Sequence, residues 1–560
     1  MVEKIKKTIP WLLIFVLISM ATGVSFNFWR PEVSAGEKEV STSVTIENSA
    51  PSWVGVPIED PISTAGSPTK AGSDVTFKGK ANDPNDENYF LIICKTAGYT
   101  TTSDGTYPSC DGGDEDTWAT STATTDNTTS TITYTTQDGD AESNAWYAYV
   151  CDVNVGDQLC SSVSQGTGDS GSPFIVNHRP SFTIVSNTSP QNPGDSVTWN
   201  TTSSESDIEG GSDTVKLMIC KDDSGITNDE CNSGISNTWC TSTYSGSDAS
   251  CAYSIPIPTD DESSPYAAYA YIVDNHYFAA AGVQASSSPY IVNNVAPVIS
   301  SVKLNGDENI NLIEGNTTST QITGIISDNN GDADIITATA KAYRSGVGAG
   351  ACTSQNDNQC YYNISCSLET ADADTSRNAT CTVSIWYHAD PTGDLTPWSA
   401  ETWLATLEGE DNNAATGSDE IGYPVEMIPM SALDVSNEDI GYGTLGVGEK
   451  RDVNVTSTIF ATGNCALDTN LSGTDMTGAA GTIAAAEQKY ATTSGEYDTT
   501  GTALSTGAVE FELELAKTTD HASTSTDDIY WGLNIPLGKP SGAYSGLNTF
   551  GAVIDELIWP

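Results

Sequence analysis

Most of the chain alternates hydrophobic and polar residues over short stretches. In "TVKLMIC" (214–220), Val215, Leu217 and Ile219 alternate with Lys216, Met218 and Cys220. A period of two is typical of β-strands, because successive side chains of a strand lie on opposite faces of its sheet. Residues that favour turns interrupt the pattern every ~8 to 15 residues. About seven such strands fit into ~120 residues, which predicts an all-β chain of immunoglobulin-like β-sandwiches.

Sequence motifs recur along the chain, roughly one domain length apart. "LIICK" (91–95) returns as "LMICK" (217–221), and "SPFIVNHRP" (172–180) returns as "SPYIVNNVAP" (288–297). A third, more diverged block contains "TWLATLEGEDNNAATG" (402–417), where Asp411 takes the place of Asp152 and Asp274. The region from 431 follows a different pattern. We therefore expect three related sandwiches and a distinct C-terminal β-sandwich, over 49–178, 179–296, 297–430 and 431–560.

The N-terminus has the pattern of an export signal. Lys4, Lys6 and Lys7 precede about 18 mostly apolar residues, a length that fits either a cleaved signal peptide or a retained membrane anchor within 1–35. The C-terminus carries no hydrophobic tail and no LPxTG-type sorting sequence. We expect the chain beyond residue 35 to lie outside the cytoplasm, at the cell surface, with membrane contact only if the N-terminal segment stays uncleaved.

The charge of the chain is strongly one-sided. It has 21 Lys and Arg against 74 Asp and Glu, giving a formal net charge of −53. A shortage of basic residues argues against nucleic acid and anionic membrane surfaces as partners. An acidic surface is compatible with solubility, cation binding or adaptation to salt.

The thirteen cysteines fall four to a repeat, with Cys465 left over. In an exported chain an even number per domain predicts two disulfides per domain. Zinc is the competing interpretation, but the chain has no C-x-x-C pair and only four histidines. The order of the cysteines favours local bridges: Cys94–Cys110, Cys151–Cys160, Cys220–Cys231, Cys240–Cys251, Cys352–Cys360 and Cys366–Cys381. Cys465 is expected to be a buried free thiol, with an intermolecular bridge as the alternative.

One stretch resembles the surroundings of a protease nucleophile. "GDSGSP" (168–173) is similar to the "GDSGGP" of chymotrypsin-like enzymes, in which a histidine base precedes the serine. Here the first histidine, His178, follows Ser170. The equivalent stretch of the next repeat is "QASSSPYIVNN", so we interpret Ser170 as part of a loop. The four histidines stand singly in the sequence, and we expect no enzymatic activity.

Acidic residues recur just before the second long strand of each repeat. They are Asp83, Asp86 and Glu87, then Glu205, Asp207 and Glu209, then Asp328, Asp332 and Asp334. Carboxylates that alternate along a loop suit Ca²⁺, which prefers oxygen ligands. The third loop lacks the glycine and the glutamate that an EF-hand requires, at Ala333 and Thr339. Calcium sites and solvated turns are both compatible with this pattern.

Two tryptophans and eight sequons are the remaining candidate sites. Trp118 and Trp239 occupy equivalent positions, and we interpret them as core anchors, with sugar-stacking platforms as the alternative. Eight N-x-S/T sequons are potential glycosylation sites: Asn127, Asn187, Asn200, Asn316, Asn363, Asn378, Asn454 and Asn470.

The repeats resemble a known group of domains. The "NxxPS" start, the "DPND" and "DNNGD" loops and the "A-x-V-x-D" strand are similar to immunoglobulin-like repeats related to polycystic-kidney-disease and cadherin-like domains of bacterial and archaeal surface proteins. The last block resembles C-terminal sandwich domains of S-layer-like envelope proteins. The resemblance implies a non-enzymatic, extracellular structural protein, an envelope component or stalk-like rod. Its partners would be itself, in a lattice or filament, or other envelope proteins and glycans. The alternative is an adhesin or glycan-binding surface protein.

Overall fold

The computed structural model describes residues 39–104, 106–161, 172–205, 207, 213–555 and 559. The expected signal or anchor segment, Ser170 and Glu209 lie outside these residues. No helix in the described part of the chain combines the length and the apolar character needed to cross a membrane.

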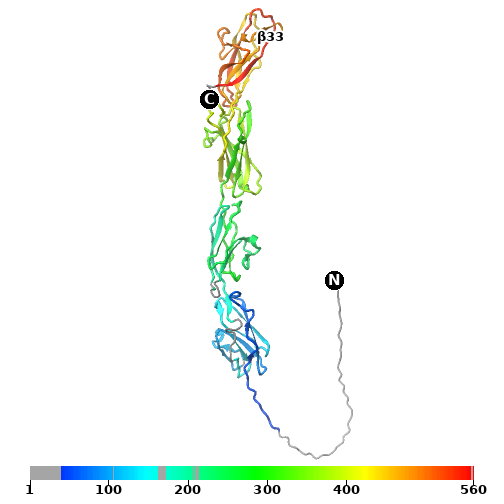
Figure 1. Ribbon diagram of the computed structural model, residues 1–560, viewed down its shortest axis with the longest axis vertical. Coiled ribbons are helices and arrows are strands. Elements are labelled where there is room, and N and C mark those ends of the chain that lie inside the picture. Colours follow the sequence, from blue (N-terminus) through cyan, green and yellow to red (C-terminus); the bar gives the residue numbers. More distant parts are fainter. Residues whose placement is uncertain are drawn as a thin grey trace, which may run out of the picture.

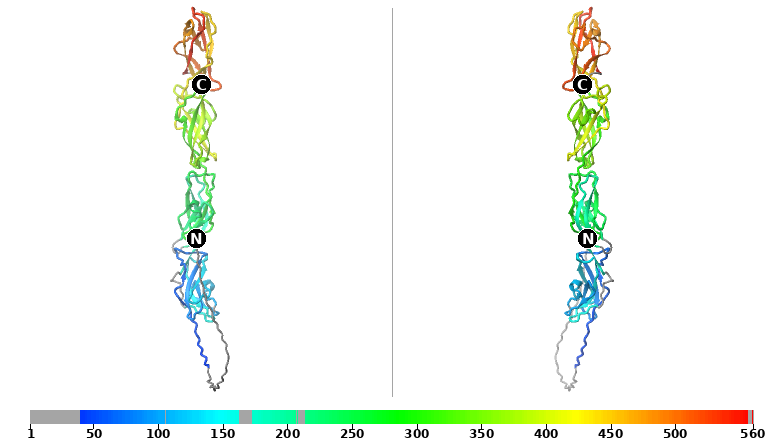
Figure 2. Two further views of the ribbon diagram at one scale, coloured as in Figure 1. Left: turned by 90° about the vertical axis from the view of Figure 1, so that its right-hand side faces the viewer. Right: turned by 90° about the vertical axis from the view of Figure 1, so that its left-hand side faces the viewer.

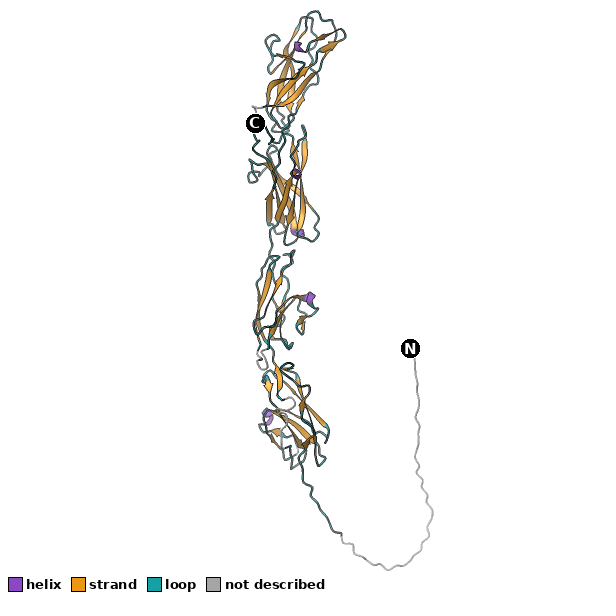
Figure 3. Cartoon of the chain, in the orientation of Figure 1, coloured by secondary structure: helices purple, strands orange, loops and turns teal. Residues whose placement is uncertain are grey.

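β-Strands joined by loops and a few short 3-10 turns make up the described chain (Figure 3). The strands pair in four groups of consecutive residues, which we call units 1 to 4. Their first and last strands or bridges span 52–177, 181–292, 298–427 and 433–554. The units follow one another in line, as the three views of Figures 1 and 2 agree.

Units 1 to 3 share one arrangement of strands, in which a central long strand of one sheet faces a central buried strand of the other. In unit 1, β4 (Asp74–Asn82) lies between β1 (Ser52–Trp53) and β9 (Thr129–Thr135). Opposite it, β5 (Tyr89–Cys94) lies between β8 (Thr117–Thr120) and β11 (Tyr147–Asp152). Two antiparallel sheets paired in this order form an immunoglobulin-like sandwich.

Units 2 and 3 repeat the same pairings. Unit 2 uses β13 (Ser181–Asn187), β14 (Ser196–Ser204) and β19 (Ser250–Ser254) against β18 (Thr238–Thr241), β15 (Val215–Cys220) and β20 (Tyr269–Asp274). Unit 3 uses β23 (Val298–Leu304), β24 (Thr317–Ser327) and β27 (Ser376–Trp386) against β26 (Cys360–Leu368), β25 (Ile335–Arg344) and β28 (Trp403–Asp411), with β29 (Thr416–Glu420) at the edge. In unit 3, β26 also pairs with β27, so the two sheets join along one edge.

Unit 4 is also a β-sandwich, but its strand order differs. One sheet is built around β31 (Lys450–Ala461), β38 (Thr526–Asn534) and β35 (Gln488–Ala491), and the other around β37 (Val509–Leu515), β32 (Leu467–Gly473) and β40 (Asn548–Ile554). The alanine-rich stretch before β35 forms only one 3-10 turn, Ala485–Glu487.

Each unit has its own hydrophobic core around one fully buried tryptophan. These residues are Trp146, Trp199, Trp403 and Trp531, all 0% exposed. A core of this kind for each ~120 residues is what a sandwich of that size can enclose.

Trp118 and Trp239 lie beside these cores rather than on an open surface. Trp118 packs edge-on against Tyr134 and Phe174, and its indole nitrogen donates to the carbonyl of Ala145 at 3.1 Å. The ammonium group of Lys95 lies 4.5 Å from its ring centroid. Trp239 makes the equivalent contacts, including an ammonium group 4.6 Å from its ring. This packing fits the core-anchor interpretation.

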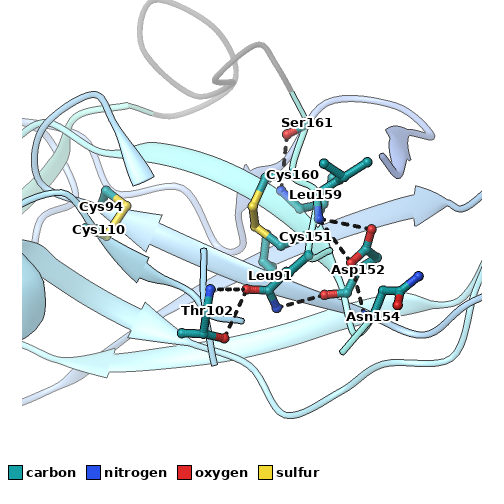
Figure 4. The surroundings of a disulfide bond; sticks show 12 residues. Leu91, Cys94, Thr102, Cys110, Cys151, Asp152, Asn154, Leu159, Cys160 and Ser161 are labelled. Atoms are coloured by element: carbon teal, nitrogen blue, oxygen red, sulfur yellow. Dashed lines mark hydrogen bonds between the residues drawn. A yellow bond between two sulfur atoms is a disulfide. The ribbon is translucent and has the colours of Figure 1, made fainter. Parts of the chain in front are cut away.

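Six disulfides close local loops within units 1 to 3, in the pairs that their spacing favours: Cys94–Cys110, Cys151–Cys160, Cys220–Cys231, Cys240–Cys251, Cys352–Cys360 and Cys366–Cys381. In units 1 and 2 the first bridge joins the end of the central buried strand to the short hairpin that follows it, whereas in unit 3 it joins the loop after β25 to the first residue of β26. Figure 4 shows the Cys151–Cys160 hairpin of unit 1. Cys465 is free and buried, and burial raises the pKa of its thiol to about 12.

The bridge between β18 and β19 gives a direct test of what a disulfide contributes here. Its loop spans 11 residues. Replacing both cysteines, C240A/C251A, should lower the free energy of unfolding by about 2 to 3 kcal/mol, because the unfolded chain regains loop entropy. Urea unfolding followed by tryptophan fluorescence measures this. C465A, which breaks no disulfide, should lower the free energy of unfolding by less. An equal decrease in the two variants would contradict the prediction.

Candidate metal centres at the unit junctions

An asparagine and an aspartate meet at the start of each of units 1 to 3. The aspartates end β11, β20 and β28, and Asp152, Asp274 and Asp411 are each 0% exposed. The asparagine comes from the segment that enters the unit. The amide of Asn48 donates to Asp152 at 2.9 Å, that of Asn177 to Asp274 at 2.8 Å and that of Asn294 to Asp411 at 3.0 Å. An equivalent Asn–Asp hydrogen bond therefore orients the entering segment of each of the three units.

The junction between units 2 and 3 gathers the most carboxylates. Oxygens of Asp328, Asp334 and Asp411 lie within 4.8 Å of one another, and these residues are 1%, 7% and 0% exposed. Unit 2 approaches from the other side, where Asp261 accepts a hydrogen bond from Asn413 at 2.8 Å. Two of the three acids, Asp328 and Asp334, belong to the acidic loop identified in the sequence, whereas Asp411 comes from the distant strand β28.

Several oxygens at this junction are buried and accept no hydrogen bond. They are one oxygen each of Asp328, Asp334, Asp261, Asn294 and Asn412. Buried polar groups are normally satisfied, since leaving one unpaired costs about 1 to 3 kcal/mol. Carboxylate and amide oxygens are the ligands that Ca²⁺ takes in six- to eightfold coordination. The donor set therefore suits Ca²⁺.

The electrostatics of this cluster also favour a bound positive charge. Burial raises the pKa of Asp328 to about 6, and burial together with the neighbouring acids raises the pKa of Asp334 to about 7. Burial likewise raises the pKa of Asp261. Burial thus opposes ionisation of these carboxyl groups, and a bound cation would favour their ionised form.

A smaller version of the cluster lies at the start of unit 1. Asp83, Glu87 and Asp152 have carboxylate oxygens within 4.8 Å of one another. Burial raises the pKa of both Asp83 and Glu87. The Cys151–Cys160 hairpin positions Asp152, which accepts hydrogen bonds from the backbone amides of Leu159 and Asn154 (Figure 4). One oxygen each of Asp83, Glu87 and Asn48 is buried and accepts no hydrogen bond.

The junction between units 1 and 2 uses its acids in another way. Asp207 accepts two hydrogen bonds from His178, at the backbone nitrogen (2.6 Å) and at Nδ1 (2.8 Å). Glu205 in turn accepts from the backbone nitrogen of Asp207 at 3.3 Å. Of the residues described at this junction, none forms a carboxylate group like that of unit 3. Asp207 and Glu205 thus accept hydrogen bonds from a histidine and from backbone, and the calcium site that would also include Glu209 stays a prediction.

Phe278 of unit 2 closes the same junction by packing against the core of unit 1. The guanidinium group of Arg179 lies 4.0 Å from its ring centroid, and the ammonium group of Lys70 lies 5.5 Å away. Lys70 also donates to the carbonyl of Tyr277 at 2.8 Å.

The remaining acids of the predicted loops lie apart from these clusters. Asp86 is exposed on a turn with φ of 59°. Asp332 faces Asp372 and Asp374, and it accepts a hydrogen bond from the backbone nitrogen of Asp372 at 2.6 Å. Asp332 and Asp334, which lie two residues apart on the 3-10 turn Asp332–Asp334, thus belong to different groups of carboxylates.

The junction between units 3 and 4 buries a positive charge. Lys517 of unit 4, whose side chain is 0% exposed, pairs with Asp390 of unit 3 at 3.1 Å. Arg344 contacts the other oxygen of Asp390 at 3.2 Å, and also Glu401 at 2.5 Å. Burial lowers the pKa of Lys517, while Asp390 opposes that shift. Beside this network His388 and His521 approach each other, so two of the histidines that stand singly in the sequence are neighbours in the fold.

The sequons differ in accessibility. Six of the asparagines are exposed, namely Asn127, Asn200, Asn316, Asn363, Asn378 and Asn454. Asn470 is half-buried, and Asn187 is half-buried with its amide donating to Ser288 and Pro289. A glycan on Asn187 would disrupt those bonds.

No protein-family model and no curated protein sequence matches the chain. Similar solved structures include a marsupial T cell receptor, with 10% identity over 64% of this chain and 98% of that one, and a TM-score of 0.24. A 1.5-MDa bacterial ice-binding adhesin has 14% identity over 68% of this chain and 99% of that one, with a TM-score of 0.22. The D1–D4 ectodomain fragment of ICAM-5 has 9% identity over 89% of this chain and 99% of that one, with a TM-score of 0.24. Similarities at this level carry no argument about ligands or partners.

Neutralising one acid of the junction between units 2 and 3 tests its electrostatics. The pKa of Asp334 is about 7 in the fold against an ordinary 3.8. This raised pKa means that the contribution of Asp334 to stability is full below about pH 4 and is lost as the pH rises through about 7. In chelator, D334N should therefore raise the free energy of unfolding at pH 8 by about 1 to 3 kcal/mol and leave it unchanged near pH 4.

In Ca²⁺ at pH 8 the wild type should instead be more stable than D334N, because a bound cation stabilises the ionised carboxylate that the variant lacks. The measurement is urea unfolding with and without millimolar Ca²⁺. E408Q, which removes an exposed acid of β28 that belongs to none of the carboxylate groups, is the control. A variant that is less stable than the wild type in chelator at pH 8 would contradict the electrostatic account.

Proposed function

We propose that the protein is a non-enzymatic structural rod of the cell surface, in which Ca²⁺ stiffens the junction between units 2 and 3. The observation that carries the proposal is that side chains or backbone groups bond across each of the three junctions. A chain of domains joined only by flexible linkers would be expected to have few such bonds, and relative domain motion would be its default behaviour.

Each junction combines several contacts between neighbouring units. At the junction of units 2 and 3, Asn330 donates to the carbonyls of Thr259 and Asn293 and accepts from the backbone nitrogen of Val295 at 2.8 Å. At that of units 3 and 4, Asn358 donates to the carbonyl of Thr519 at 2.8 Å. Glu314 accepts from Thr462 at 2.7 Å. These bonds would resist bending of the rod.

The proposed calcium ligands lie where such stiffening would act. Asp328, Asp334 and Asp411 would bind one ion together with Asp261, which unit 2 supplies. Asp83, Glu87 and Asp152 would bind a second ion beside Asn48, in the segment that enters unit 1. An ion bound by both units would add a direct tie between them.

The six disulfides fit an extracellular structural or adhesive protein, since such bonds persist outside the reducing cytoplasm. We propose that units 1 to 4 are separate domains with boundaries at 49–178, 179–296, 297–430 and 431–560, and that the N-terminal segment exports or anchors them. Other copies of the rod, or other envelope proteins, would be its partners.

Unit 4 offers one observation in favour of an adhesive role. An open, largely apolar groove of about 710 Å³ lies between 440–447 and 535–544, near strand β33 (Met476–Gly478), which Figure 1 labels. Its lining includes Ile440, Leu445, Ile535 and Tyr544. If unit 4 is an adhesin domain, Y544A should abolish attachment of the rod to its target surface without changing the length of the rod.

Small-angle X-ray scattering tests the calcium-stiffened rod. With millimolar Ca²⁺ the wild type should give the maximum dimension of a straight chain of four units. With chelator it should give a smaller maximum dimension and a broader distribution of interatomic distances. D261N should show the chelator behaviour even in Ca²⁺, because unit 2 then loses its charged ligand. D260N alters the exposed neighbouring acid and should behave as the wild type. Identical profiles in Ca²⁺ and chelator would overturn the proposal.

A further inference from the structure

Two of the four histidines lie at the junction between units 3 and 4, where sequence spacing gives no hint of a site. His388 follows β27 in unit 3, and His521 belongs to the loop that leads to β38 in unit 4. One ring nitrogen of each and a carboxylate oxygen of Asp357 lie within 4.8 Å of one another. Both units therefore contribute to this group.

The hydrogen bonds of His388 fix which of its nitrogens is available. Asn358 donates through its amide to the carbonyl of Thr519, so its Oδ1 is the atom that faces His388 Nδ1 at 3.2 Å and Lys517 Nζ at 2.8 Å. Because that oxygen can only accept, Nδ1 of His388 carries the proton and Nε2 carries the lone pair. His388 is 0% exposed, and its buried Nε2 makes no hydrogen bond.

The surroundings hold both imidazoles in place. The ring of His521 stacks on Trp386 with centroids 4.0 Å apart and planes at 5°. The ring of His388 is nearly parallel to that of His521, at 6° and 6.3 Å between centroids. A metal-binding histidine is usually oriented by a hydrogen bond from its other ring nitrogen to an oxygen, as His388 donates from Nδ1 to Asn358.

The charged residues around His388 and His521 are compatible with a bound cation. Asp357 and Asp520 face His521, with oxygens 4.0 and 3.7 Å from its Nδ1. The nearby Lys517 is already paired with Asp390.

We propose that His388, His521 and Asp357 bind one divalent transition-metal ion of the Zn²⁺, Cu²⁺ or Co²⁺ type, which ties unit 3 to unit 4. Two imidazoles and one carboxylate are a donor set for these ions, whereas Ca²⁺ takes oxygen ligands. Three protein ligands leave coordination positions for water. This site is independent of the calcium clusters.

The test uses the full chain, produced without a polyhistidine tag and treated with chelator before the metal is added. Co²⁺ titration followed by visible absorption should show one saturable site per chain that persists in excess Ca²⁺. Zn²⁺ should displace the Co²⁺ and raise the unfolding temperature. The continuous-wave spectrum of bound Cu²⁺ in electron paramagnetic resonance should show coupling to imidazole nitrogen.

H521Q is the decisive variant, because the side chain of His521 is 43% exposed and its loss should not disturb the fold. It should weaken Co²⁺ binding by at least about tenfold and abolish the stabilisation by Zn²⁺. D357N should also weaken binding. H276Q removes a histidine that pairs with Asp213 in unit 2, and it should bind Co²⁺ as the wild type does. Equal binding by H521Q and wild type, displacement by Ca²⁺, or the absence of a saturable site would overturn the proposal.

Discussion

Burial of carboxylates between neighbouring units is the constraint on which the arrangement of this chain depends. A chain with 74 acidic and 21 basic residues has few cations of its own to neutralise acids at its junctions. An uncompensated buried carboxylate is costly, so each junction needs a hydrogen-bond donor, a basic residue, a proton or a bound ion.

The three junctions meet this requirement by different chemistry. The first pairs Asp207 with His178 and places Arg179 over Phe278. The third pairs Asp390 with both Lys517 and Arg344. The second concentrates Asp328, Asp334 and Asp411 without a basic residue in the group, and this difference is the physical basis for placing Ca²⁺ there.

Rigid sandwiches make these junctions possible. Asp152, Asp274 and Asp411 end strands whose side chains are buried in the cores, so the position of each carboxylate follows from the packing of its sheet. In unit 1 the disulfide hairpin adds the amides that hold Asp152. The asparagine of the entering segment then has a fixed acceptor, which orients each unit relative to the segment before it.

The sequence allows the sandwiches to be predicted better than the sites between them. Period-two patterns and repeated motifs report local structure, as in Val215–Cys220, so the all-β fold follows from them. The acidic loops can be predicted because their residues are close in sequence, but Asp411 is supplied by the distant strand β28. The bonds from Asn48, Asn177 and Asn294 span 104, 97 and 117 residues, and no local pattern reports such distances. The "NxxP" motif marks these three asparagines in the sequence, but only the fold shows that each one bonds to an aspartate. The approach of His388 to His521 left no sequence signal, because it depends on how unit 4 docks on unit 3.

The most direct measurement of the central claim is negative-stain electron microscopy of single molecules, with the angle between neighbouring units recorded at each junction in Ca²⁺ and in chelator. The account predicts narrow distributions at all three junctions in Ca²⁺. In chelator it predicts a broader distribution between units 2 and 3, and unchanged ones at the other two junctions, where histidine, lysine and arginine bond to the acids. Equal broadening at all three junctions, or none at the second, would contradict it.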